Sequence, residues 1–156
     1  LRNGGFDGKV TLIGEAPVVP YQRPPLSKAY LMGEMALERL YLRPESFYAE
    51  NDIGLRTGTR VEAVDTENQS IQLDGETLSY DELVLATGSV PRPLPAAIGG
   101  SLDNVFLVRD LADADAMAQH FTKGVRVLII GGGYTVYRQI LKLEQDADHN
   151  DADTKR

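Results

Sequence analysis

The sequence predicts an α/β fold, and three short apolar segments carry that prediction. Residues 9–13 (KVTLI), 82–86 (ELVLA) and 125–130 (VRVLII) are each rich in residues that favour strands. The second and third are almost continuously apolar, which is typical of strands buried on both faces of a parallel sheet. Helical spacing in the segments between them completes the α/β pattern.

Composition narrows the class of protein. A chain of 156 residues can form one domain with a real core. Its formal net charge of -7 argues against nucleic-acid binding, because phosphate neutralisation needs a basic face. We find no signal peptide and no apolar run long enough to span a membrane, so we expect a soluble, cytoplasmic protein.

Two residue types bear on the chemistry. Cysteine is absent, which excludes disulfides, thiolate metal sites and a cysteine nucleophile. The two histidines, His120 and His149, have no partner at ligand spacing, so we expect no metal site.

The strand at 9–13 ends in an acid, Glu15. Before it, residues 1–5 have the pattern of a helix end with glycine as C-cap. A helix followed by a strand that ends in an acid is the order of a dinucleotide-binding βαβ unit, where the acid accepts hydrogen bonds from ribose hydroxyls. Without the proline corner that follows it, Glu15 would more simply be interpreted as an exposed acid at a strand end.

A proline corner, residues 21–31 (YQRPPLSKAYL), follows this strand. Its two prolines fix φ and allow a short helix from Leu26 to Met32 to start at once. The corner should hold Arg23 and Lys28 close together on a stiff frame. A surface turn with solvated charges is the simpler alternative. What favours a site is position: the corner follows a strand that ends in Gly14-Glu15, and a second segment downstream ends in Ala86-Thr87-Gly88.

The middle of the chain predicts a small antiparallel meander between about residues 55 and 80. Asp74-Gly75 is a strong hairpin signal. Three prolines at 91, 93 and 95 then predict an extended connection. The other expected elements are a helix at 46–50, strands at 55–56, 59–64, 70–73 and 77–78, and a helix at 111–121 with Asp110 as N-cap and Ala114 and Met117 among its apolar positions.

Five segments carry a resemblance to a known family: IGEAPVVPYQRPPLSKAYL, LYLRPESFY, GTRVEAVD, YDELVLATGSVPRPLP and VLIIGGGY. Together they resemble the FAD-dependent ferredoxin reductases of bacterial oxygenase systems, which belong to the pyridine-nucleotide-disulfide oxidoreductase superfamily. The resemblance extends from the first residues to about Tyr134. It implies hydride transfer from NAD(P)H to FAD, followed by single-electron transfer to an iron–sulfur ferredoxin.

The resemblance also implies an organisation. We expect an internal fragment: a partial Rossmann-like FAD-binding domain with a β-meander insertion at 1–95, the start of an NAD(P)-binding Rossmann unit at 96–144, and a disordered polar tail at 145–156. The second glycine motif, G-x-G-x-x-G, has Val136 in place of its third glycine. Arg138 stands where similar enzymes carry a glutamate that pairs with Lys28.

The site residues follow from the same resemblance. Lys28 is expected beside the flavin, and no other residue is expected to be catalytic. The residues expected to contact FAD are Glu15, Arg23, Lys28, Val61, Ala86, Thr87, Gly88 and Arg109, and those expected to contact NAD(P) are Gly131 and Gly133. A surface salt bridge is the alternative role for Arg109.

Other functions remain open at this stage. A related branch, an apoptosis-inducing-factor-like NADH oxidoreductase or the FAD subunit of a nitrite reductase, shares the proline corner. A different class is a non-catalytic remnant that binds no flavin and serves at most as an interaction module. Exposed sheet edges would then favour self-association. We expect that the chain alone does not turn over.

Overall fold

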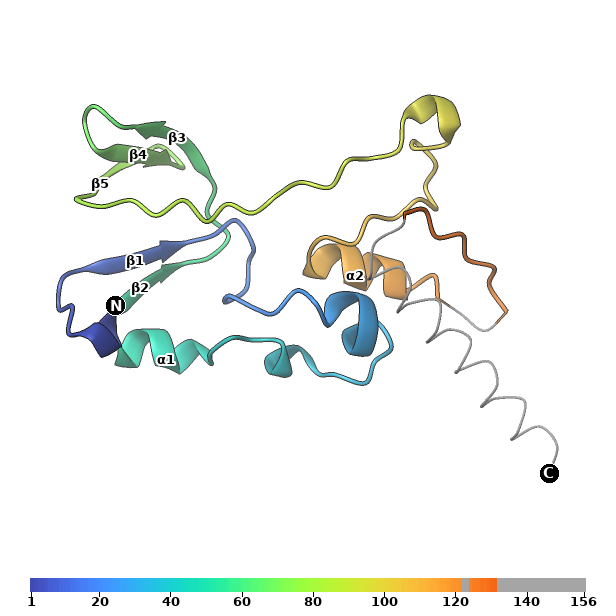
Figure 1. The fold of residues 1–156 in the computed structure, drawn as a ribbon, viewed down its shortest axis with the longest axis horizontal. Coiled ribbons are helices and arrows are strands. Elements are labelled where there is room, and N and C mark those ends of the chain that lie inside the picture. The colour runs from blue at the N-terminus through green and yellow to red at the C-terminus, as the bar shows by residue number, and fades with distance from the viewer. Residues whose placement is uncertain (122–123, 132–156) are drawn as a thin grey trace. The chain divides into compact units, whose positions relative to one another are not determined.

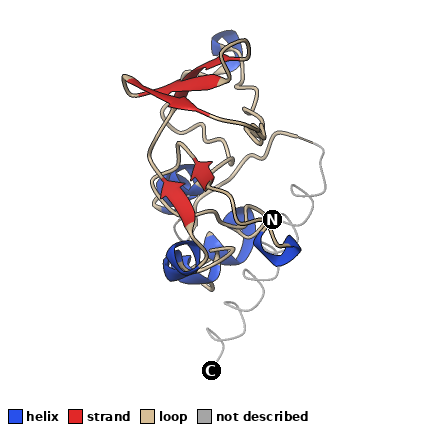
Figure 2. Cartoon of the chain, turned by 90° about the vertical axis from the view of Figure 1, so that its left-hand side faces the viewer, coloured by secondary structure: helices blue, strands red, loops and turns tan. Residues whose placement is uncertain are grey.

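The computed structural model describes residues 1–121 and 124–131, and its helices and strands form a mixed α/β chain (Figures 1 and 2). The chain divides into two compact units. The first contains residues 1–22 and 37–89, and the second contains, among the described residues, 23–36, 90–121 and 124–131. The α/β class predicted from the sequence is confirmed, whereas the domain limits near 95 and 144 stay predictions.

A parallel pair of strands forms the centre of the first unit. Strand β1 (Val10–Ile13) pairs with β2 (Ile53–Arg56), in a register that runs from Val10 opposite Ile53 to Ile13 opposite Arg56. Helix α1 (Glu45–Glu50) leads into β2 and buries Tyr48. The predicted strand at 9–13 and helix at 46–50 are confirmed, and β2 begins two residues earlier than predicted.

The same unit contains an antiparallel meander of β3 (Val61–Asp65), β4 (Ser70–Leu73) and β5 (Glu76–Ser79), in that order. The β4–β5 turn places Asp74 at φ 47° and Gly75 at φ 79°. Positive φ at both central residues is the geometry that an Asp-Gly hairpin favours. The predicted hairpin is therefore confirmed.

The second unit packs helix α2 (Leu111–Ala118) against η2 (Leu26–Tyr30), the wide helical turn of the proline corner. The Tyr30 hydroxyl donates to Asp115 Oδ1 at 2.7 Å. Asp110 caps α2 as predicted, and the predicted apolar positions 114 and 117 are buried.

The sequence predicts a regular short helix at 26–32, and this prediction is wrong because the segment is kinked. Lys28 has φ -136° and ψ -115°, outside the helical region. The Pro25 carbonyl accepts from the amides of both Lys28 and Tyr30, at 2.9 and 3.1 Å. Because one carbonyl serves two donors at different spacings, the corner forms a kinked turn and not a helical ladder.

The apolar runs 82–86 and 125–130 are not the buried strands that the sequence predicts. Both lack strand pairing, and Val84 and Leu128 are 85% and 84% exposed. A strand requires a hydrogen-bonded neighbour. Among the residues that the structure describes, the parallel sheet contains only β1 and β2. Three short 3₁₀ turns complete the elements: η1 (Arg2–Gly4), η3 (Leu37–Arg39) and η4 (Ala96–Ile98).

Candidate functional site

The site predicted around Glu15 lies at the carboxyl end of the β1–β2 pair. The Gly14 amide donates to the Arg56 carbonyl at 2.9 Å, and the Gly14 carbonyl accepts from the Thr59 amide at 3.0 Å. One step further, Gly58 donates to the Ala16 carbonyl at 2.9 Å. These bonds fix the backbone on both sides of Glu15. Parallel sheets bind ligands at this end of their strands.

One oxygen of the Glu15 carboxylate accepts a hydrogen bond from Arg60. Arg60 Nη1 donates to Glu15 Oε1 at 2.8 Å, and the side chains of Arg60 and Glu15 are 72% and 68% exposed respectively. Such an exposed pair contributes at most about 1 kcal/mol to stability. In the described part of the chain Oε2 accepts no hydrogen bond, so one oxygen remains available to a ligand hydroxyl.

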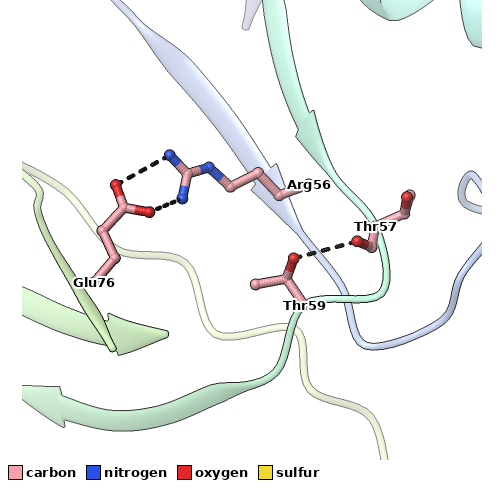
Figure 3. A network of polar contacts seen from close by, with 4 residues as sticks. All are labelled: Arg56, Thr57, Thr59 and Glu76. Carbon is pink, nitrogen blue, oxygen red and sulfur yellow. Dashed lines mark hydrogen bonds and ion pairs between the residues drawn. The ribbon is translucent and has the colours of Figure 1, made fainter. Parts of the chain in front are cut away.

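A second ion pair fixes the segment that carries Arg60 (Figure 3). Arg56, the last residue of β2, donates to Glu76 of β5 through two nitrogens, at 2.6 and 3.3 Å. The hydrogen bond and the opposite charge raise the pKa of Arg56 and lower the pKa of Glu76. Thr59 Oγ1 also donates to the Thr57 carbonyl, at 3.2 Å. The meander is thereby tied to the parallel pair just where the chain turns toward Arg60.

The other predicted FAD residues of the first unit differ in their surroundings. Val61 begins β3 directly after Arg60 and pairs with Leu73. The turn 86–88 is exposed and irregular, and Gly88 has φ 72°, a conformation that glycine adopts without strain. No hydrogen bond within residues 1–121 and 124–131 joins this turn to Glu15.

The predicted basic residues belong to the second unit. Arg23 Nη1 donates to the Arg109 carbonyl at 2.6 Å, and the Arg109 amide donates to Asp113 Oδ2 at 2.8 Å. These contacts bring Arg23 to the backbone of Arg109. Lys28 is half-buried in the kinked turn. Within the described residues Arg109 forms no salt bridge, the alternative role considered for it.

Some of the predicted NAD(P) residues lie at the end of the described chain or outside it. Gly131 is the last residue that the structure describes, and it has φ 144°. Gly133, Val136, Arg138 and the polar tail lie outside the described residues. In the described part, no helix is long and apolar enough to cross a membrane, and no three potential metal ligands gather.

The sequence did not predict Arg56 and Arg60, the two arginines at the carboxyl end of the β1–β2 pair. Arg60 lies 45 residues from Glu15, and Arg56 lies 20 residues from Glu76. Neither pair has the short spacing that identifies a motif. The one feature of the sequence that could have indicated these contacts is the basic residue on each side of the loop 57–59.

A cavity of about 250 Å³ lies at the opposite, amino-terminal end of β1 and β2. It is lined by Leu1, Arg2, Asn3, Val10, Phe47, Asn51 and Ile53. It shares no residue with the predicted site.

A parallel strand pair with an acid at its carboxyl end is an arrangement that α/β proteins of the dinucleotide-binding class share. The pyridine nucleotide-disulphide oxidoreductase family matches residues 1–137, and the chain belongs to this family.

The chain is similar to several named reductases and to a solved crystal structure. Putidaredoxin reductase of Pseudomonas putida is 46% identical over 137 residues, which are 86% of this chain and 32% of that protein. A ferredoxin–NAD(P)(+) reductase of a Sphingomonas species is 42% identical over 135 residues, again 86% of this chain and 32% of the relative. The crystal structure of a covalent putidaredoxin reductase–putidaredoxin complex matches with TM-score 0.82 and 44% identity, over 90% of this chain and 35% of that one. The chain spans about a third of the length of these relatives.

Proposed function

We propose that this chain contributes part of the FAD site of an NAD(P)H:ferredoxin oxidoreductase. The observation that carries the proposal is Glu15, held by backbone bonds at the carboxyl end of two parallel strands with one carboxylate oxygen available. The names of the similar reductases, and the complex of one of them with putidaredoxin, support the activity and an iron–sulfur ferredoxin as partner.

The residues present fit the chemistry of FAD. Glu15 supplies an acceptor for ribose hydroxyls. By the family resemblance, the cations of the second unit, Arg23, Lys28 and Arg109, would supply positive charge for the diphosphate, and Lys28 would be the cation beside the flavin. Gly88, at φ 72°, allows backbone to approach the adenosine without a side chain in the way.

FAD, when bound, accepts the hydride and releases single electrons. The role of this chain is to bind the cofactor and set its electrostatic surroundings. Gly131 and Gly133 would begin the NAD(P) loop. No other side chain is assigned a catalytic step, in keeping with chemistry that resides on the cofactor.

Titration of the purified chain with FAD tests the proposal. Flavin absorbance that stays with the protein after desalting is the expected result, and NADH should then be tested as reductant. Glu15→Gln should weaken FAD binding about tenfold, the loss of a charge-assisted hydrogen bond. Glu62→Gln, an exposed carboxylate on β3, is the matched control. A colourless wild-type chain would contradict the proposal.

The exposed apolar runs favour one competing function, a remnant that binds no flavin and associates with itself. Val84 and Leu128 are the most exposed large apolar residues of these runs, at 85% and 84%. Unpaired apolar segments of this kind promote edge-to-edge association. Size-exclusion chromatography in the same experiment separates the two functions: a compact monomer that retains flavin supports the FAD site, and a colourless oligomer supports the remnant.

A further inference from the structure

Arg60 has no role in the site described so far, although it contacts the most informative residue in it. The Arg60 guanidinium donates a hydrogen bond to Glu15 Oε1 at 2.8 Å. Arg60 also immediately precedes Val61, whose backbone the family resemblance leads us to expect near the adenine of FAD. Arg60 therefore links two residues that are both expected on the adenosine side of the cofactor.

The fold, and not the ion pair, brings Arg60 to this place. The amides of Gly58 and Thr59 bond the Ala16 and Gly14 carbonyls, on either side of Glu15. Gly58 has φ 63°, the left-handed conformation that turns the chain back at this point. The pairing of β2 with β1, which ends at Ile13 opposite Arg56, sets where the loop begins. An exposed pair alone would be too weak to impose this geometry.

We propose that Arg60 is a positioning residue that orients the Glu15 carboxylate toward the ribose of the FAD adenosine, an inference that rests on the proposed FAD site. Its planar guanidinium holds Oε1, which leaves Oε2 to accept from a ribose hydroxyl. A free glutamate side chain must lose its rotamer freedom when a ligand binds. Because Arg60 already restricts the Glu15 side chain in the free protein, less rotamer entropy is lost when FAD binds.

The effect should appear in affinity. Pre-organisation of one flexible side chain corresponds to about a three- to tenfold change in dissociation constant. We therefore expect Arg60→Met to weaken FAD binding to the 156-residue chain by about this factor. Arg60→Lys, which keeps the positive charge, should recover part of the loss. Arg39→Met, an exposed arginine of the same unit without a hydrogen-bond partner among the described residues, is the matched control.

Two readouts separate positioning from a general structural effect. In a double-mutant cycle, Arg60→Met should add little to the loss caused by Glu15→Gln, because both changes remove one interaction. Calorimetry with ADP and 2′-deoxy-ADP should show that the wild type prefers the hydroxylated ligand and that Arg60→Met loses part of this preference. Far-UV circular dichroism and the unfolding midpoint should match the wild type, since the pair is exposed.

The outcomes distinguish this inference from the proposed function. If Arg60→Met binds FAD as tightly as the wild type, or if its loss adds fully to that of Glu15→Gln, the positioning role is refuted and the FAD site stands. If the wild-type chain binds neither FAD nor ADP, the proposed site is refuted, and the role of Arg60 with it.

Discussion

Arg2 is the side chain whose removal should destabilise the first unit most clearly. Its guanidinium donates to four carbonyls, each at 2.8 Å: Nε to Asn51, Nη1 to Phe6 and Gly8, and Nη2 to Asp52. One side chain thus joins the η1 turn, the loop before β1 and the turn between α1 and β2. Asp52, at φ 50°, is the left-handed residue of that last turn.

The magnitude follows from the burial of these bonds. The bonds to Asn51 and Gly8 are partly buried, and those to Phe6 and Asp52 are exposed. Partly buried hydrogen bonds contribute about 1 kcal/mol each, and exposed ones a few tenths. We expect Arg2→Met, which keeps the aliphatic stem but no donor, to lower the free energy of unfolding by about 2–3 kcal/mol.

Urea denaturation followed by far-UV circular dichroism measures this change. Thermal unfolding should agree, with a midpoint lowered by roughly 5–10 °C. Arg39→Met is the control for loss of one positive charge and should stay within about 0.5 kcal/mol of the wild type. An Arg2→Met chain as stable as that control would refute the reasoning. FAD affinity should not change, because Arg2 lines the cavity at the other end of the strands.

Two further predictions concern carboxylates. Asp110→Ala removes the capping box of α2 and should cost about 1 kcal/mol by urea denaturation, whereas Asp103→Ala, at an exposed position, should cost nothing measurable. The pKa of Glu76 is lowered by Arg56, and the pKa of Asp65 is lowered by hydrogen bonds that its carboxylate accepts. Both groups bind protons more weakly when folded, so they stabilise the fold above their unfolded pKa near 4 and lose this effect as pH falls through the folded pKa. Glu76→Gln and Asp65→Asn should each flatten the fall in Tm between pH 7 and pH 3, and an unchanged slope would contradict this.

Local signals in the sequence predicted local structure well. The Asp74-Gly75 hairpin and the cap at Asp110 depend on residues within a few positions of each other, whose backbone preferences act without help from the rest of the chain. The spacing of Ala114 and Met117 predicted the buried face of α2 for the same reason.

Contacts between distant residues could not be predicted in this way. The family resemblance and its place at a strand end predict Glu15 as a site residue, but its partner Arg60 depends on the path of the loop 57–59. Arg2 is a similar case, since its acceptors include carbonyls 49 and 50 residues away. A backbone carbonyl has no sequence signature, so such an arginine looks like any surface charge.

The two apolar runs also show that strand formation depends on contacts with distant residues. Residues 82–86 and 125–130 have strong strand preferences, yet both are irregular and exposed. Preference describes how well a segment suits a pleated, buried surface, and the hydrogen bonds must come from a neighbour. In the described residues β1 and β2 pair only with each other, so neither run has such a neighbour. Their exposure therefore reflects the missing pairing and not a weak strand sequence.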